Sequence, residues 1–357
     1  MDMKTQRRFF LCIFTVVAFV AITACANASS QDQTAPRNII YLIGDGMGYG
    51  QVSTLIMENA VNKEKYEPSQ INRIKHMGMA TTYSASSKVT DSAAGGTALA
   101  TGEKTNNGTV GLNPQGDTLT SVLVEAAAMG KSTGIVVNTA ILDATPAAFY
   151  AHVPQRKLWD EIAMQLTHHS FDVLMGDGLM FFNEREDSLN LIEVFKNKGY
   201  TFSDSWEEAK TWDIEDRMLV LTDIKYLLPQ AVEKALEWLD RKDNPNGFFL
   251  MIEQARIDGK GHNNEVQGLV FEMEVMDQVM KVVLDYADAH PGTLVVITAD
   301  HETGGANIGY DGRPFFSTKG HTGSVVPVFA YGPGAECFTG LMDNIEIPAR
   351  LRQLMSY

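Results

Sequence analysis

The sequence has few cysteines, a deficit of basic residues and an apolar run too short to cross a membrane, and each shortage excludes a class of protein. Lys and Arg total 29 against 44 Asp and Glu, and this net charge of -15 argues against a protein that binds the nucleic-acid phosphate backbone. The apolar run Phe9–Ile22 has 14 residues, whereas a membrane-spanning helix needs about 20. With 45% hydrophobic and 20% charged residues, the 357-residue chain is neither disordered nor collagen-like.

The first 24 residues have the pattern of a signal peptide, because basic residues precede the short apolar run. A short buried helix is the alternative. Two cleavage sites compete: Ile22-Thr23-Ala24-Cys25 resembles a lipobox, and Ala26-Asn27-Ala28 suits ordinary signal peptidase. The lipobox is favoured, so we expect residues 1–24 to be removed, a lipid on Cys25 and a polar linker over residues 25–36. The protein is then exported, and is either periplasmic or lipid-anchored to the cell envelope, with that lipid as its only membrane contact.

Only three cysteines occur: Cys12 in the apolar run, Cys25 at its end and Cys337 in the body of the chain. If Cys25 carries a lipid, no intramolecular disulfide framework is possible. We therefore expect an exported protein that takes its stability from a large core or from bound metal.

From about Arg37 onward, continuous apolar runs alternate with helical patterns. Runs rich in Val, Ile, Leu and Phe are typical of strands buried on both faces. The candidate strands are Asn38–Ile43, Thr133–Val137, Phe171–Met175, Phe248–Ile252, Thr293–Thr298 and Val326–Tyr331. The clearest helices are expected at Leu119–Met129, between caps Thr118 and Gly130, and at Glu265–Ala289. This alternation predicts an α/β fold: one large three-layer α/β/α domain around a mostly parallel sheet.

Polar residues of the kind that bind ligands follow several of these strands. Ligands of such sheets bind beyond the carboxyl ends of the strands. The residues concerned are Asp45, Glu253, Asp258, Asp300 and His301, whereas His321 precedes the last strand. Their placement predicts a polar site at one edge of the sheet, although loops are polar in general.

Taken one at a time, these motifs leave their function open. Asp45 between two glycines is more often a turn former. Asp258 and His262 are four residues apart and could share one helix face as zinc ligands, with a loop salt bridge equally plausible. Asp300-His301 before a Gly-Gly turn favours a metal site. The pair Asp91-Ser92 read alone is a helix cap, but beside two metal ions a serine could act as a nucleophile.

Together the motifs resemble those of the alkaline phosphatase family, in order from about Asn38 to the C-terminus. The stretches that carry the resemblance are Thr90-Asp91-Ser92-Ala93-Ala94, Asp143-Ala144-Thr145-Pro146-Ala147-Ala148 followed by Arg156, and Thr298 to Gly305. The resemblance implies two Zn²⁺, one on Asp258, His262 and His321 and one on Asp45, Asp300 and His301. It implies one Mg²⁺ on Asp45, Thr145 and Glu253, with Asp143 outside its direct ligands. Ser92 would be the nucleophile and Arg156 the phosphate clamp, oriented by Asp91.

The implied reaction is hydrolysis of small phosphate monoesters through a phosphoserine, with residues 37–357 as the catalytic domain. Because Ala93, Ala94 and two glycines follow Ser92, the pattern that a sulfatase needs is absent. A phosphodiesterase of the same superfamily and a non-catalytic surface lipoprotein are the alternatives. Relatives are often homodimers, so a homodimer is expected on resemblance alone. Other members carry a side chain that tunes phosphate affinity where this chain has Gly259.

Overall fold

The computed structural model describes residues 35–61, 68–213, 216–225 and 227–356. From Ala35 onward the chain forms one compact unit. The expected signal peptide, the lipid site at Cys25 and nearly all of the polar linker lie outside the described residues. None of the helices in the described ranges has the length and apolar character needed to cross a membrane.

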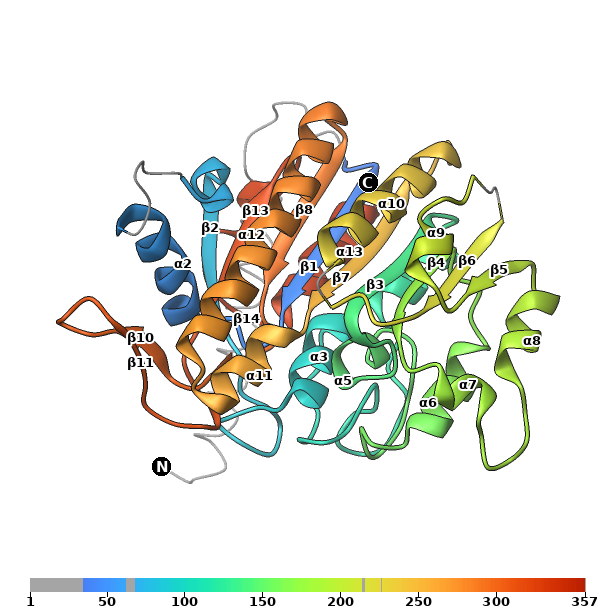
Figure 1. Ribbon diagram of the computed structural model, residues 1–357, viewed down its shortest axis with the longest axis horizontal. Helices are drawn as coiled ribbons and strands as arrows, with labels where there is room; N and C mark the ends of the chain where they lie inside the picture. Colours follow the sequence, from blue (N-terminus) through green and yellow to red (C-terminus); the bar gives the residue numbers. More distant parts are fainter. Residues whose placement is uncertain (1–34, 62–67, 214–215, 226, 357) are drawn as a thin grey trace, which may run out of the picture. The chain divides into compact units, whose positions relative to one another are not determined.

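The centre of this unit is a ten-stranded sheet in the order β14-β2-β13-β8-β1-β7-β3-β4-β6-β5 (Figure 1). Its strands are β1 (Asn38–Gly44), β2 (His76–Thr81), β3 (Ser132–Ala140), β4 (Val173–Asp177), β5 (Tyr200–Ser203), β6 (Arg217–Leu221), β7 (Phe248–Gln254), β8 (Thr293–Thr298), β13 (Val326–Tyr331) and β14 (Gly340–Asp343). All neighbouring pairs are parallel except those that include β13. The predicted mostly parallel α/β sheet is confirmed.

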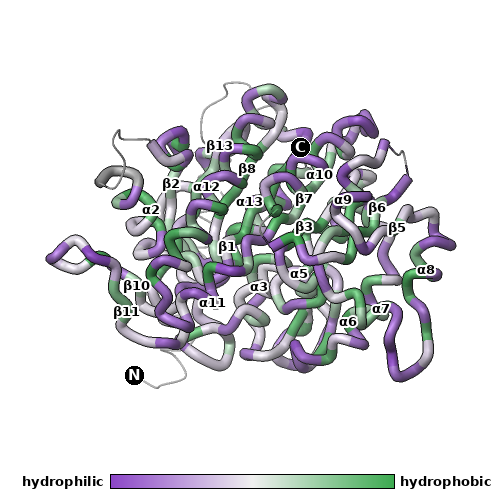
Figure 2. The backbone as a smooth tube through the Cα atoms, in the orientation of Figure 1, coloured by the Kyte–Doolittle hydropathy of each residue, from purple (hydrophilic) through white to green (hydrophobic). Residues whose placement is uncertain are grey.

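The central strands β1, β7 and β8 are buried along their whole length. Helices cover both faces of the sheet, so the side chains of these strands pack into the core on either side. This burial explains why each strand is a continuous apolar run, visible as green in Figure 2. Of the six expected strands, β8 and β13 have the predicted bounds, and β4 begins two residues later than predicted.

β13 is antiparallel to both neighbours because no helix connects it to β8. The chain leaves β8 at Thr298 and forms the short ladder of β9 (Glu302–Thr303) with β12 (His321–Thr322). It also forms the hairpin of β10 (Ala306–Ile308) with β11 (Pro314–Phe316) before it enters β13. A parallel return needs a crossover to the far edge, whereas this connection stays at one edge. His321 therefore reaches the ligand edge although it precedes its strand.

Figure 1 shows α10 and α12 in front of the sheet and α13 behind it. α12 packs against α2 and α10, while α13 packs against α3 and α4. The helices are α2 (Tyr49–Val61), α3 (Ser92–Thr101), α4 (Val122–Ala128), α5 (Ala144–Ala147), α6 (Trp159–Leu166), α7 (Met180–Asn183), α8 (Leu191–Asn197), α9 (Trp206–Ala209), α10 (Leu228–Arg241), α11 (Arg256–Asn263), α12 (Val266–Ala289) and α13 (Glu346–Met355), with 3-10 turns at Gln70–Arg73 and Ala335–Phe338.

The helix expected at Leu119–Met129 begins three residues later than predicted. Its N-cap is Ser121, not Thr118, because the Ser121 hydroxyl accepts a hydrogen bond from Val124 N and donates one to Phe149 O. A serine that satisfies a free amide of the first turn defines the helix start. α12 begins at Val266, one residue after the predicted start, and ends at Ala289 as predicted.

Candidate metal centre and nucleophile

The candidate site lies at the carboxyl edge of three adjacent strands. β7, β1 and β8 are neighbours in the sheet, and Ile43 is in register with both Glu253 and Thr298. Asp45 follows β1 directly, Glu253 lies at the end of β7, and Asp300 follows β8. The parallel register therefore brings these three carboxylates to one place, as the sequence pattern predicts.

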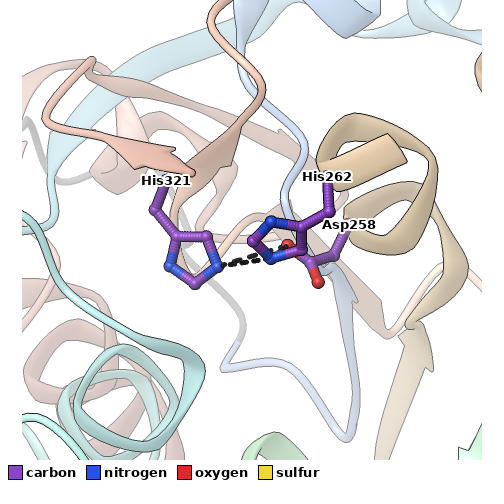
Figure 3. A group of neighbouring side chains, drawn as sticks. All are labelled: Asp258, His262 and His321. Atoms are coloured by element: carbon purple, nitrogen blue, oxygen red, sulfur yellow. Dashed lines mark hydrogen bonds and ion pairs between the residues drawn. The ribbon is translucent and has the colours of Figure 1, made fainter. Parts of the chain in front are cut away.

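A first group consists of Asp258, His262 and His321 (Figure 3). His262 Nε2 is 3.3 Å from Asp258 Oδ1 and 3.1 Å from His321 Nε2, and His321 Nε2 is 3.4 Å from Asp258 Oδ1. Asp258 and His262 are one helical turn apart on α11, and His321 comes from β12. The predicted i,i+4 pair therefore lies on a helix, with a third possible ligand, His321, beside it.

Backbone carbonyls fix the orientation of both imidazoles in this group. His262 Nδ1 is 2.5 Å from Lys319 O, and His321 Nδ1 is 2.9 Å from Thr90 O. A carbonyl only accepts, so each Nδ1 carries the proton and donates it, which leaves each Nε2 lone pair directed into the group. Metal-binding histidines are held in this way.

A second group consists of Asp45, Asp300 and His301, and all three side chains are buried. His301 Nε2 is 3.4 Å from Asp45 Oδ1 and 3.3 Å from Asp300 Oδ2. Gly46 N and His301 N both donate to Asp300 Oδ1. The His301 and His321 rings stack with centroids 3.6 Å apart, so the two groups are immediate neighbours.

The spacing within both groups suits zinc. Zinc binds nitrogen and oxygen at about 2.0–2.2 Å in a tetrahedron, so two ligand atoms of one ion lie about 3.3 Å apart. The five separations given above range from 3.1 to 3.4 Å. Carboxylates and imidazoles at these distances form a donor set that a zinc ion would satisfy.

A third set of oxygen donors adjoins the second group. Asp45 Oδ1, Thr145 Oγ1 and Glu253 Oε2 are buried and have no hydrogen-bond partner within the described part of the chain. Buried polar atoms are rarely left in this state, and a bound cation would satisfy all three oxygens at once. An oxygen-only donor set suits a hard cation such as Mg²⁺.

Ser92 begins α3 beside the second group, and its hydroxyl is 3.2 Å from His301 Nε2. The cap of this helix is Asp91, whose Oδ1 accepts from Ala94 N. Ser92 is therefore not the helix cap, and its hydroxyl is left free to face the site. Its side chain is buried at the positive end of α3, where negative charge is favoured.

Arg156 points toward the same site between two aspartates. Its Nη2 donates to Asp143 Oδ1 at 3.0 Å, and its Nη1 is 3.7 Å from Asp91 Oδ2. Asp143 is therefore the closer partner of the guanidinium, a contact that the sequence did not indicate. Asp91 also accepts from Gly108 N through Oδ2, while Gly108 O accepts from Arg156 N. Asp91 thus holds the nucleophile helix and the segment that carries Arg156.

The carboxylates repel one another in the absence of cations. Burial, then repulsion from Asp300, raises the pKa of Asp45 well above its usual value. Burial and the neighbouring Asp143 do the same for the pKa of Glu253, and burial and Asp258 raise the pKa of Asp300 to about 6. Burial lowers the pKa of His301, which favours its neutral, metal-binding form. Bound cations would relieve this repulsion between the buried carboxylates.

The two groups open into a cavity of about 590 Å³. Its lining includes Asp45, Ser92, Asp143, Arg156, Asp258, His262 and His321, together with Thr139, Ala255, Arg256, Gly259, Lys260 and Asn263. A small ester could therefore reach Ser92 and Arg156 at once. A Cβ built on Gly259 would meet no atom within 4 Å, so this wall of the cavity is open.

The structure gathers every candidate residue named from the sequence at this one edge. Sequence reasoning missed the lining residues Thr139, Arg256, Lys260 and Asn263, and gave Thr303 no part. Arg256, Lys260 and Asn263 recur at i, i+4 and i+7 on α11, on a different side of the helix from Asp258 and His262, so the spacing of those two ligands does not indicate them. Thr303 stood inside a motif already singled out.

Comparison with known proteins points to the same family as the sequence motifs. The family model for alkaline phosphatase matches residues 36–317. Alkaline phosphatase 4 of Bacillus subtilis is 31% identical over 415 aligned positions, which cover 91% of this chain and 90% of the relative.

Solved structures show the same likeness. Alkaline phosphatase from the Antarctic bacterium TAB5 is 32% identical and superposes with a TM-score of 0.82, covering 90% of this chain and 98% of that one. A TAB5 variant with Mg bound in its M3 site is also 32% identical, with a TM-score of 0.80 over 90% of this chain and 99% of that one.

Proposed function

Since the chain belongs to the alkaline phosphatase family and is a phosphatase, we propose that it hydrolyses small phosphate monoesters through a phosphoserine on Ser92, with two Zn²⁺ and one Mg²⁺ as cofactors. The observation that carries the proposal is the Ser92 hydroxyl beside two adjacent groups of carboxylate and imidazole donors.

Each of the three donor sets would hold one cation. One zinc ion would be held by Asp258, His262 and His321 and the other by Asp45, Asp300 and His301. Magnesium would be held by Asp45, Thr145 and Glu253, each of which has a buried oxygen without a hydrogen-bond partner in the described part of the chain. When bound, these ions would lower the pKa of the Ser92 hydroxyl and place positive charge beside the phosphoryl oxygens.

The residues of this chain perform the remaining tasks. Ser92 Oγ attacks phosphorus, a new O–P bond forms, and the bond to the ester oxygen breaks as the alcohol leaves. Water then attacks the phosphoserine and releases inorganic phosphate and free Ser92. Arg156 offers two parallel N–H groups to the phosphoryl oxygens, which suits a tetrahedral anion. Two successive in-line displacements retain the configuration at phosphorus.

Catalysis is tested with p-nitrophenyl phosphate and its bis-ester on purified protein. We expect the monoester to be hydrolysed far faster, EDTA to abolish the activity, and Zn²⁺ with Mg²⁺ to restore it. Ser92→Ala should remove the activity. Ser53→Ala is the matched control, because the Ser53 hydroxyl donates to Tyr49 O on α2, away from the cavity. Equal rates on both esters would favour the phosphodiesterase alternative, and a fully active Ser92→Ala variant would refute the nucleophile.

Export and assembly are separate proposals. We propose that residues 1–24 are removed during export and that Cys25 carries a lipid, which leaves the enzyme periplasmic or anchored to the cell envelope. Mass spectrometry of the mature N-terminus distinguishes a lipidated Cys25 from cleavage after Ala28. Homodimer formation is proposed from family resemblance, and sedimentation equilibrium tests it.

A further inference from the structure

Thr303 is a fully buried residue whose side chain contacts ligand residues of both zinc groups. Its hydroxyl donates to Asp258 Oδ1 at 2.6 Å, in the first group. The same oxygen is 3.1 Å from His301 Nδ1, in the second group. None of the roles proposed above uses Thr303.

The two contacts have fixed directions. The Asp258 carboxylate accepts, so the single hydroxyl proton of Thr303 points toward it. The Thr303 oxygen is then left to accept from His301 Nδ1–H. This bond places the proton of His301 on Nδ1 and directs the Nε2 lone pair toward Ser92, Asp45 and Asp300. One hydroxyl therefore orients a carboxylate of one group and sets the tautomer of an imidazole of the other.

The backbone of Thr303 is held as firmly as its side chain. Thr303 pairs with His321 across the β9–β12 ladder, so a third ligand residue depends on its position. Its N donates to Gly46 O, and its O accepts from Gln51 Nε2 at 2.7 Å.

Two glycines leave the space that Thr303 fills. A Cβ at Gly46 would lie 2.9 Å from Thr303 Oγ1, and one at Gly261 would lie 2.9 Å from Thr303 Cγ2. Real Cβ atoms do not approach so closely, so the absence of side chains at both positions keeps Thr303 in its contact with Asp258 and His301.

We infer that Thr303 is a positioning residue that couples the two zinc sites, so that loss of its hydroxyl weakens both. The inference rests on the proposed function. Residues that hydrogen-bond to metal ligands typically contribute 10–100-fold to metal affinity. Loss of a residue that supports one site would weaken the binding of only that zinc ion. The geometry of Thr303 instead predicts a loss of this size in the zinc affinity of each site.

The test compares the Zn²⁺ affinity of both sites in wild type, Thr303→Val and Thr303→Ser, by competition with a chelator. The Co²⁺ absorption spectrum of each variant reports the ligand geometry. Valine keeps the shape and removes the hydroxyl, and serine keeps the hydroxyl. Thr298→Val is the matched control, since Thr298 is equally buried but its hydroxyl donates to a backbone carbonyl, Pro327 O.

We expect Thr303→Val to lower the Zn²⁺ affinity of both sites about 10–100-fold and to alter the Co²⁺ spectrum. The Zn²⁺ affinities of Thr303→Ser and Thr298→Val should stay within about threefold of wild type. Unchanged affinities in Thr303→Val, a loss at one site alone, or a serine variant as weak as valine would overturn the inference.

If Thr303→Val does not fold, Thr303→Ser and Thr303→Ala replace it, because they differ only in the hydroxyl. A tenfold weaker alanine variant then supports the inference, and equal affinities overturn it. A wild-type chain that binds no zinc would overturn the proposed function together with the inference, whereas zinc binding with unchanged variants overturns the inference alone.

Discussion

The effect of Asp300→Asn on the free energy of unfolding should change sign with zinc: the substitution should stabilise the metal-free protein at neutral pH and destabilise the zinc-bound one. The carboxylate is fully buried, and its pKa in the folded, metal-free protein is about 6, against 3.8 for the ordinary group. A raised carboxyl pKa means that the folded state binds more protons than the unfolded state between these two values. The stability that Asp300 contributes is therefore fully present below pH 3.8 and is lost as the pH rises through 6.

The size of this loss follows from the shift. About two pKa units at 1.36 kcal/mol each correspond to about 3 kcal/mol. Asparagine has nearly the same shape, can accept the same bonds from Gly46 N and His301 N through its Oδ1, and does not ionise. Relative to wild type, metal-free Asp300→Asn should therefore gain about 2 kcal/mol in free energy of unfolding between pH 4 and pH 7, which is most of the full shift. The substitution also removes the repulsion by which Asp300 raises the pKa of Asp45, and this second change acts in the same direction as the first.

The assay is urea unfolding followed by circular dichroism at pH 4, 5, 6 and 7, after EDTA treatment and again with excess Zn²⁺. With zinc, wild type should be the more stable protein at pH 7, because an ion that binds only the folded state at 1,000 times its Kd adds about 4 kcal/mol. Parallel pH profiles of the two metal-free proteins, or equal stabilisation of both by zinc, would refute this explanation of the buried carboxylates.

Three further substitutions, one of them with a matched control, test separate parts of the structure. Arg156→Lys keeps the charge but loses the paired N–H groups, so kcat/KM for p-nitrophenyl phosphate should fall about 100-fold in steady-state assays; an unchanged value would exclude the clamp. Gly46→Ala should lower the thermal midpoint of unfolding and the zinc content measured by elemental analysis, because Gly46 has φ +76° and a Cβ there would lie 2.8 Å from Asp258 Cα. Gly259→Ala is its control and should leave the zinc content unchanged, because a Cβ at Gly259 would meet no atom within 4 Å. Ser121→Ala should lower the free energy of unfolding by about 1–2 kcal/mol in urea titrations with kcat unchanged; a loss of kcat would show that α4 influences the site.

The parts of the fold that sequence predicts best are those where burial alone decides the structure. β8 and β13 are continuous apolar runs with the predicted bounds. β5 lies at one edge of the sheet, and β2 and β14 at the other, where partial exposure weakens that signal. β6 is a buried apolar run beside β5 that the sequence analysis did not name. The antiparallel direction of β13 depends on a connection without a helix, which periodicity does not reveal.

The candidate site shows the same division. The spacing of Asp258 and His262 indicates them as ligands, and the position of Asp300 after a strand indicates it as a site residue. Thr145 and Arg156 were named only through family resemblance, because a threonine before proline and a single arginine are usually structural. Thr303 depends on a hydroxyl that lies between side chains 45 residues and two residues away, and no local pattern encodes such a contact.

The most direct test of the central claim is an anomalous difference map at the zinc edge from crystals of the zinc-loaded protein. We expect two strong peaks beside Ser92: one about 2 Å from Nε2 of His262 and His321, and one about 2 Å from Nε2 of His301. A map with no peak at these imidazoles, or with zinc bound only at a distance from Ser92, would contradict the proposal that the two groups hold metal around the nucleophile.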